Sequence, residues 1–116
     1  MEPGSSWKSR FSKEIDQARA ARRSGNEGKA RVCARRAAGI VVQEALRRYG
    51  TSLTDPSAYV HLKYFHDLPR ISPDIQDVIS HFLMRITEEG NLPIEADLIQ
   101  DALWLATELL PNSSID

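Results

Sequence analysis

One predicted helix, residues 29–49, is apolar around most of its circumference. At about 100° per residue, its alanines, its cysteine and its branched aliphatic residues form a continuous strip with a flank on each side. A limited polar arc remains, marked by Arg36, Gln43 and Arg47. A helix with so little polar surface packs against neighbours on several sides. This segment is therefore predicted to be the central helix of an all-α fold.

Four further segments have apolar residues at helical spacing, and no segment alternates apolar and polar residues as a strand does. The break at 25–28 is short enough to make the first two helices antiparallel neighbours. We predict one domain over residues 1–116, an up-and-down four-helix bundle with an extra short helix between its second and third long helices. The predicted helices span residues 6–24, 29–49, 57–66, 73–88 and 94–110, followed by a frayed tail at 112–116.

Proline, glycine and capping residues predict where the later helices begin and end. Ser72-Pro73-Asp74 combines a hydroxyl N-cap, a proline in the first turn and an early carboxylate, so a helix is expected to start there. Gly90-Asn91 predicts the end of that helix, and Pro93 predicts the start of the last one.

Length and composition place the chain among soluble globular domains. Its 116 residues suffice for one core, and 41% hydrophobic with 27% charged residues excludes a disordered or collagen-like chain. The longest apolar run, Ala37 to Val42, is too short to span a membrane, and the first residues do not have the pattern of a signal peptide. A single cysteine excludes an internal disulfide. We therefore expect a cytoplasmic protein with no membrane partner.

The formal net charge of −1 conceals two oppositely charged halves. Residues 1–50 hold 12 of the 15 lysines and arginines but 5 of the 16 aspartates and glutamates, which gives a charge of +7. Residues 51–116 carry the remaining charges, with a balance of −8. Such asymmetry indicates either an anionic partner for the first half or neutralisation of one half by the other.

The sequence contains no motif of a known cofactor or metal chemistry. A phosphate loop, a dinucleotide fingerprint and a zinc-protease signature are all missing, so no cofactor is expected. Cys33 lies on the inward side of its helix and is interpreted as a small core residue, with a reactive thiol beside Arg36 as the alternative. Asp77 and His81 are one helical turn apart and are interpreted as a surface pair, so no metal site is predicted.

His61 and His66 lie beside a predicted aromatic cluster of Tyr59, Tyr64 and Phe65. We interpret both as histidines at the edge of the core that hydrogen-bond to the backbone. The alternative is acid–base chemistry, because Asp67 follows His66 directly and Arg70 is close in sequence. His66 and Arg70 are therefore accessory candidates for a functional site.

Arg31 and Arg35 are the basic residues that a solvated helix face does not explain, because they share an apolar flank with Ala38, Val42 and Leu46. An unpaired charge in such a place is costly. Three partners are open: carboxylates of the acidic half in the same chain, the same pairing across a dimer interface, or the phosphates of a nucleotide or RNA. The carboxylates concerned are Asp55, Asp67, Asp74, Asp97 and Asp101. The basic residues of the first helix are interpreted as a solvated face; they are Arg10, Lys13, Arg19, Arg22 and Arg23.

The order of these elements resembles the HEPN superfamily of prokaryotic helical domains, in which two long antiparallel helices precede a short helix and two further helices. The resemblance covers nearly the whole chain and is most suggestive at Gly25–Gly39, a helix start rich in small residues and arginine. Many members of that family are metal-independent ribonucleases or nucleotide-binding modules, often dimeric and paired with a nucleotidyltransferase. The resemblance thus implies the fold, a homodimer and a nucleotidyltransferase-type partner protein.

The ribonuclease members of the HEPN superfamily carry an arginine followed by four to six residues and then a histidine. None of His61, His66 and His81 has an arginine five to seven positions before it. No catalytic residue is therefore carried over from the family to this chain.

The main functional hypothesis is a non-catalytic, homodimeric, HEPN-like module that binds a nucleotide or RNA. Its phosphate contacts are predicted to be Lys29, Arg31, Arg35 and Arg36. The alternative is a protein-interaction or structural module whose charge asymmetry serves dimerisation or docking to a partner protein. A divergent ribonuclease that uses His66 is the third hypothesis.

Overall fold

The computed structural model describes residues 5–85, 91–92 and 94–111. Within these ranges the chain forms five α-helices and no β-strand, so the prediction of an all-α protein is confirmed. None of these helices is both long and apolar enough to cross a lipid bilayer. The helices are α1 (Ser5–Arg23), α2 (Glu27–Arg48), α3 (Ala58–His66), α4 (Pro73–Leu83) and α5 (Leu98–Leu109).

α2 is the central helix, as its apolar circumference predicts. It contacts α1, α3 and α5, and half of its residues are buried. α1 turns back on α2 as an antiparallel neighbour and buries one narrow stripe that contains Trp7, Phe11, Ile15 and Ala18. The turn between the two helices uses Gly25 in the left-handed conformation (φ 84°), which favours glycine.

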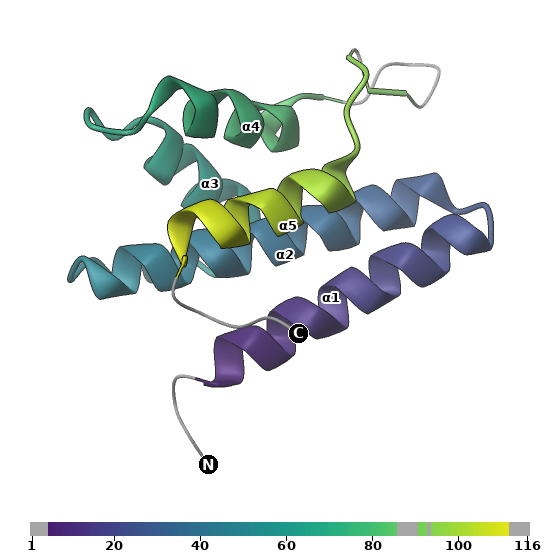
Figure 1. Ribbon diagram of the computed structural model, residues 1–116, viewed down its shortest axis with the longest axis horizontal. Helices are drawn as coiled ribbons and strands as arrows, with labels where there is room; N and C mark the ends of the chain where they lie inside the picture. The colour runs from purple at the N-terminus through teal and green to yellow at the C-terminus, as the bar shows by residue number, and fades with distance from the viewer. Residues whose placement is uncertain (1–4, 86–90, 93, 112–116) are drawn as a thin grey trace.

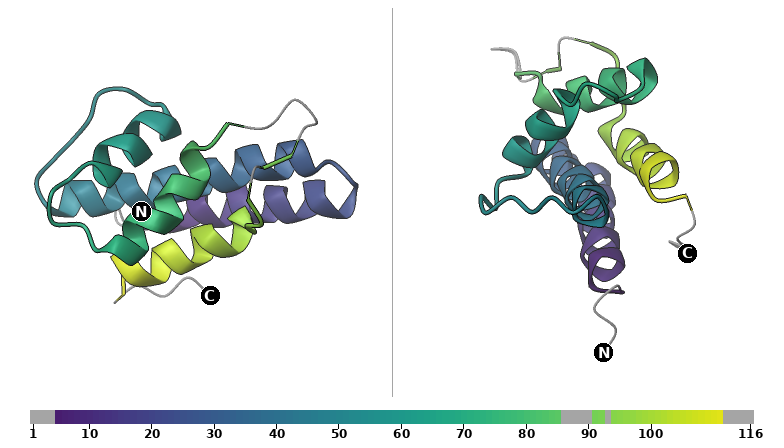
Figure 2. Two further views of the ribbon diagram at one scale, coloured as in Figure 1. Left: turned by 90° about the horizontal axis from the view of Figure 1, so that it is seen from above. Right: turned by 90° about the vertical axis from the view of Figure 1, so that its left-hand side faces the viewer.

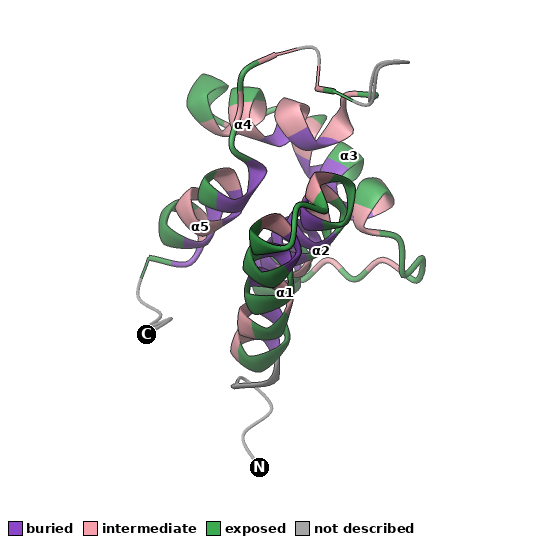
Figure 3. Cartoon of the chain, turned by 90° about the vertical axis from the view of Figure 1, so that its right-hand side faces the viewer, coloured by how far each residue is buried: buried purple, intermediate pink, exposed green. Residues whose placement is uncertain are grey.

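α5 lies beside α2 and runs in the same direction, while α3 and α4 cross above this layer (Figures 1 and 2). The buried residues face one another on the inner sides of the helices, as Figure 3 shows in purple. Leu62 and Phe65 of α3, Phe82 of α4 and Leu105 of α5 all belong to this core and are at most 1% exposed. One continuous hydrophobic cluster therefore holds together all five helices.

α3 approaches α2 most closely at Gly39. A Cβ atom on Gly39 would lie 2.7 Å from the Cβ atom and 3.0 Å from the Cα atom of Ala58, so only glycine fits this position without a shift of α3. Ser57 precedes Ala58 and caps the helix, because its hydroxyl accepts a hydrogen bond from the backbone N–H of Val60. The close approach places the beginning of α3 directly beside the exposed face of α2.

α4 ends at Leu83, five residues before the predicted end, and Met84 is already extended (φ −73°, ψ 143°). In a longer helix the carbonyl oxygen of Phe82 would accept a hydrogen bond from residue 86. Instead it accepts one from Nε of Arg35, at 3.0 Å. A cation at the carboxyl end of a helix is also favoured by the helix dipole. The predicted helical residues 86–88 and the predicted stop at Gly90 lie outside the described residues.

α5 begins at Leu98, four residues after its predicted start. Its N-cap is Asp97, whose Oδ1 accepts hydrogen bonds from the backbone N–H groups of Ile99 (3.1 Å) and Gln100 (3.3 Å). Pro93, on which the prediction of the start rested, lies outside the described residues, as does the predicted tail at 112–116. The predicted N-cap of α4 at Ser72 is confirmed.

Candidate anion-binding site

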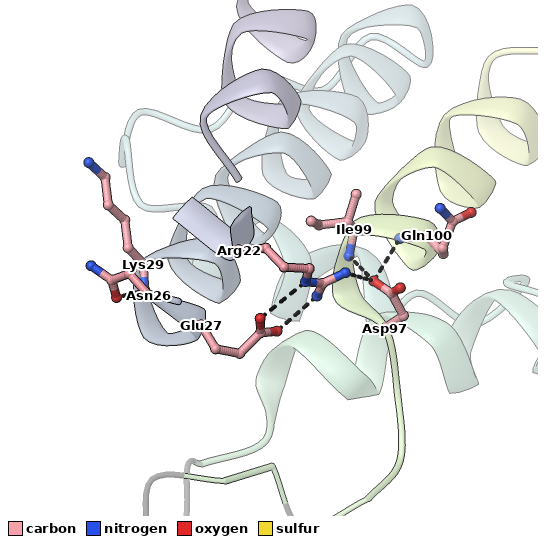
Figure 4. Close-up of polar contacts among 7 residues, drawn as sticks. All are labelled: Arg22, Asn26, Glu27, Lys29, Asp97, Ile99 and Gln100. Carbon is pink, nitrogen blue, oxygen red and sulfur yellow. Dashed lines mark hydrogen bonds and ion pairs between the residues drawn. The ribbon is translucent and has the colours of Figure 1, made fainter. Parts of the chain in front are cut away.

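The two oppositely charged halves of the chain meet at Arg22, in the last turn of α1 (Figure 4). Its Nε and Nη2 donate to the two carboxylate oxygens of Glu27 at 3.1 and 2.8 Å, and its Nη1 donates to Oδ1 of Asp97 at 3.0 Å. The sequence interpretation of Arg22 as part of a solvated face is therefore wrong. Asp97 is one of the carboxylates predicted to pair with an arginine of the basic half, but its partner is Arg22 of α1 and not Arg31 or Arg35 of α2.

Asp97 both caps α5 and pairs with Arg22. Partial burial tends to raise the pKa of its carboxyl, but the hydrogen bond from Arg22 and those from the N–H groups of Gln100 and Ile99 together outweigh burial and lower it. The charged form of Asp97 is therefore favoured in the folded protein.

Replacing Asp97 with alanine is expected to lower the free energy of unfolding by about 1 to 2 kcal/mol, because both the cap and the ion pair are lost. Asp97→Asn keeps the cap and loses the ion pair, so its cost is expected to be about 0.5 kcal/mol. Urea unfolding of the two variants measures this difference. Equal losses in both would contradict the capping role.

Asp97 also makes the free energy of unfolding depend on pH. Since the pKa of Asp97 is lower in the folded than in the unfolded protein, its contribution is fully present above the unfolded pKa, about 4, and is lost as the pH falls through the folded value. The stability difference between wild type and Asp97→Asn is thus expected to shrink below about pH 4.

Arg35 has a partner that none of the three sequence hypotheses named. Its Nε donates to the carbonyl oxygen of Phe82, so it caps α4, and it forms no ion pair with a carboxylate among the described residues. Arg31 is half-buried near the start of α2. The pKa of Glu27 is lowered mainly by its hydrogen bond with Arg22, and the charge of Arg31 adds to this effect. The two arginines therefore do not form one site.

Arg35→Ala is expected to destabilise the protein by about 1 kcal/mol, because the carbonyl of Phe82 loses its donor and the end of α4 loses a cation. The matched control is Arg36→Ala, which removes an exposed neighbouring arginine and is expected to change the stability by less than about 0.5 kcal/mol. Both values come from urea denaturation followed by circular dichroism. Equal stability of the two variants would exclude the capping role.

A cleft of about 670 Å³ lies over the exposed face of α2, between α1 and the beginning of α3. Four cationic side chains line it: Arg10 and Lys13 from α1, and Arg35 and Arg36 from α2. Arg10, Lys13 and Arg36 are exposed and form no hydrogen bond or ion pair with any residue in the described ranges. Three cations without an ion pair to a described residue therefore line one cleft, together with a single carboxylate, Glu14.

The remaining lining of the cleft combines apolar and aromatic side chains with polar ones such as Gln17 and Gln43. Val32, 44% exposed, and the partly buried Ile40 lie on the α2 face, and Tyr59, 47% exposed, comes from α3. The volume of the cleft lies within the range of small-molecule sites.

Glu14 and His61 also line this cleft, and each contributes a buried polar atom without a hydrogen-bond partner. The atoms are Oε1 of Glu14 and Nε2 of His61. His61 is 3% exposed, and this burial lowers its pKa although the charge of Asp55 opposes the effect. The expectation of a backbone hydrogen bond for His61 is therefore wrong within the described part of the chain, since no donor or acceptor there pairs with its ring.

The candidate residues from the sequence are distributed over several places. Arg35 and Arg36 line the cleft, whereas Lys29 lines a second hollow, of about 310 Å³, near the turn between α1 and α2. His66 lies at the end of α3, where its Nδ1 is 2.9 Å from Oδ1 of Asp67, and neither it nor the exposed Arg70 is among the residues that line the cleft. The cleft residues Arg10, Lys13 and Glu14 were missed, because a helix projection does not show what lies across from a polar face.

Cys33 is 1% exposed, and burial raises the pKa of its thiol, so its interpretation as a core residue is confirmed. The predicted pair of Asp77 and His81 is present, but His81 also has a closer partner. Its Nδ1 lies 2.9 Å from Oδ2 of Asp101 on α5, whereas its Nε2 is 3.9 Å from Asp77. Among the described residues, no cluster of three or more His, Cys, Asp or Glu side chains has the geometry of a metal site.

No family model, no curated protein and no solved structure matches this chain. A function is therefore inferred from the charges, the shape and the polar atoms of the cleft.

Proposed function

We propose that this protein is a non-catalytic, HEPN-like helical module that binds the phosphate groups of a nucleotide or RNA in the cleft between α1, α2 and α3. The observation that carries the proposal is the convergence of Arg10, Lys13 and Arg36 on one cleft, with no ion pair to any described residue. Guanidinium and ammonium groups are the usual protein partners of phosphate. An anion that enters the cleft would be met by all three.

The aromatic residue at the cleft supports a nucleotide over a simple inorganic anion. In the sequence, aromatic residues are mostly absent from the basic first half, which leaves no evident surface for base stacking. The fold brings Tyr59 from α3 to the wall of the basic cleft, with about half of its side chain exposed. A base that stacks on this ring while its phosphate meets the cations would combine two interactions that single-stranded nucleic-acid sites commonly use.

The HEPN resemblance and the assembly are further parts of the proposal. The helix order, with two long antiparallel helices, a short helix and two more helices, supports an up-and-down four-helix bundle of that type. The same resemblance favours a homodimer and a nucleotidyltransferase-type partner protein. The missing arginine–histidine spacing favours binding over ribonuclease activity.

Binding of a fluorescein-labelled single-stranded RNA of about ten nucleotides, and of ATP, to the full chain tests this proposal. Three phosphate contacts predict a slope of about −2 for log K against log salt, so binding is expected to weaken by about 16-fold between 50 and 200 mM salt. The readout is fluorescence anisotropy for RNA and calorimetry for ATP. If neither probe binds measurably at about 50 mM salt, where screening is weak, the proposal is wrong.

A protein-interaction module is the second candidate, and the exposed apolar side chains favour it. Val32 and Tyr59 beside the cleft and Tyr64 on the same helix as Tyr59 are 44%, 47% and 41% exposed. Exposed aromatic side chains, such as these two tyrosines, are enriched at protein interfaces. This role requires a stable dimer, so a monomer in light scattering at micromolar concentration would count strongly against it.

A further inference from the structure

Arg35 belongs both to the cleft and to the end of α4. It is among the residues that line the cleft, and its Nε donates to the carbonyl oxygen of Phe82 at 3.0 Å. No residue of α4, which the structure describes from end to end, lines the cleft itself. One partly buried side chain of α2 therefore joins the cleft to a helix that does not line it.

The guanidinium of Arg35 has donors that its contact with α4 does not use. An arginine side chain carries five N–H donors in a planar fork, and the contact with Phe82 occupies only the one on Nε. Arg35 forms no other hydrogen bond or ion pair with the residues in the described ranges. Nη1 and Nη2 are therefore available as a pair, which is the arrangement that binds two oxygens of one phosphate.

The end of α4 has no backbone cap of its own in the described part of the chain. The capping residues of α2, α3 and α5 donate their backbone N–H groups to carbonyls of the preceding turn. Met84, which caps α4, donates to no carbonyl of a described residue, and its backbone is already extended. The carbonyl of Phe82 receives its hydrogen bond from Arg35 instead. The last turn of α4 thus depends on where the Arg35 side chain is held.

We infer that Arg35 couples phosphate binding in the cleft to the last turn of α4. A phosphate held by Nη1 and Nη2 fixes the guanidinium, so the hydrogen bond from Nε to the carbonyl of Phe82 persists and the end of α4 opens less often. The coupling is reciprocal, because a side chain already held by α4 is preorganised for the phosphate. This inference rests on the proposed function and adds to it a conformational response of the same site.

The coupling makes Arg35 a fourth cation in contact with the ligand, beside Arg10, Lys13 and Arg36. For the ten-nucleotide RNA the expected slope of log K against log salt steepens from about −2 to about −3. Arg35→Ala is expected to return the slope to about −2. Fluorescence anisotropy over a salt series measures both slopes, and equal slopes would exclude contact between Arg35 and the ligand.

Amide hydrogen exchange of the full chain, with and without saturating ATP, measures the coupling itself. Residues 80–85, at the end of α4, are expected to exchange about fivefold more slowly with ATP bound, which is the lower end of the usual coupling between two sites. The last turn of α5 is the internal control, because a helix end opens locally and this one does not line the cleft. Its exchange rate is expected to change by less than about twofold.

Two alanine variants distinguish the coupling from affinity alone. Arg35→Ala is expected to bind ATP about tenfold more weakly and to show no slowing at residues 80–85 at saturation. Arg36→Ala also loses a phosphate contact, but it keeps Arg35, so saturating ATP is still expected to slow exchange there about fivefold. Arg35→Lys keeps the charge without the planar fork and is expected to regain part of the affinity but not the slowing. Circular dichroism of each variant checks that the fold is intact.

The possible results separate the coupling from the proposed function. ATP that binds wild-type protein without slowing exchange at residues 80–85 overturns the coupling and leaves phosphate binding in the cleft standing. A slowing that persists in Arg35→Ala overturns the assignment to Arg35, and Arg35→Lys decides the same point if the alanine variant does not fold. Absence of binding for both ATP and the RNA is instead the failure of the proposed function.

Discussion

Gly39→Ala is expected to lower the free energy of unfolding by about 2 kcal/mol, although alanine is intrinsically the better helix former by about 1 kcal/mol. The new Cβ atom would lie 2.7 Å from Cβ and 3.0 Å from Cα of Ala58, and neither atom can rotate away. Relief requires α3 to move from α2, which loosens the packing of Leu62 and Phe65 in the core. The same movement would displace one wall of the cleft.

Gly28→Ala is the matched control, because it makes the same chemical change in the same helix. A Cβ atom there would meet only Oδ1 of Asn26, at 3.9 Å, so the variant is expected to be as stable as wild type or slightly more stable, by up to about 0.5 kcal/mol. Urea unfolding followed by circular dichroism gives both values. If both glycine variants gain stability, the close crossing of α2 and α3 is refuted.

Reversal of two cleft charges, Lys13→Glu with Arg36→Glu, is expected to weaken binding of the ten-nucleotide RNA by about a hundredfold or more at low salt. Two phosphate contacts are lost, and two negative charges now repel the ligand. The salt dependence is expected to flatten as well, with the slope of log K against log salt reduced by about 1 to 2. Fluorescence anisotropy over a salt series measures both quantities.

The matched control is Arg19→Glu with Arg23→Glu, which changes the net charge by the same amount. Both arginines are exposed on α1, neither lines the cleft, and neither pairs with a residue in the described ranges. Only the screened long-range field changes, so the expected loss is at most about tenfold. Equal losses for the two double variants would place RNA binding outside the cleft.

The helices and the inward-facing residues were predictable from the sequence because they depend on local periodicity. The apolar circumference of α2 was a sufficient signal for its central position, and half of its residues are buried. Ser72 was predictable as a cap because its signal lies within three residues of the helix that it starts.

The helix ends that differ from their predicted positions, the end of α4 and the start of α5, have contacts with distant parts of the chain. The early end of α4 is accompanied by a contact between Arg35 and Phe82, which are 47 residues apart in sequence. The late start of α5 is accompanied by a contact between Asp97 and Arg22, which are 75 residues apart. A projection of one helix contains no information about either partner. The cleft was missed for the same reason, because the face that carries Arg10 and Lys13 becomes a wall only when α3 packs across α2.

The bridge from Arg22 to Asp97 also bears on the order in which the protein assembles. α1 and α2 are joined by a three-residue turn, so their pairing closes a short loop at small entropic cost. α5 reaches α2 and α1 only after the chain has passed through α3 and α4. Arg22 and Asp97 therefore join an early hairpin to a late-arriving helix. Asp97 is also the N-cap of α5. We therefore expect α5 to dock on the hairpin and to form its first backbone hydrogen bonds in one cooperative step.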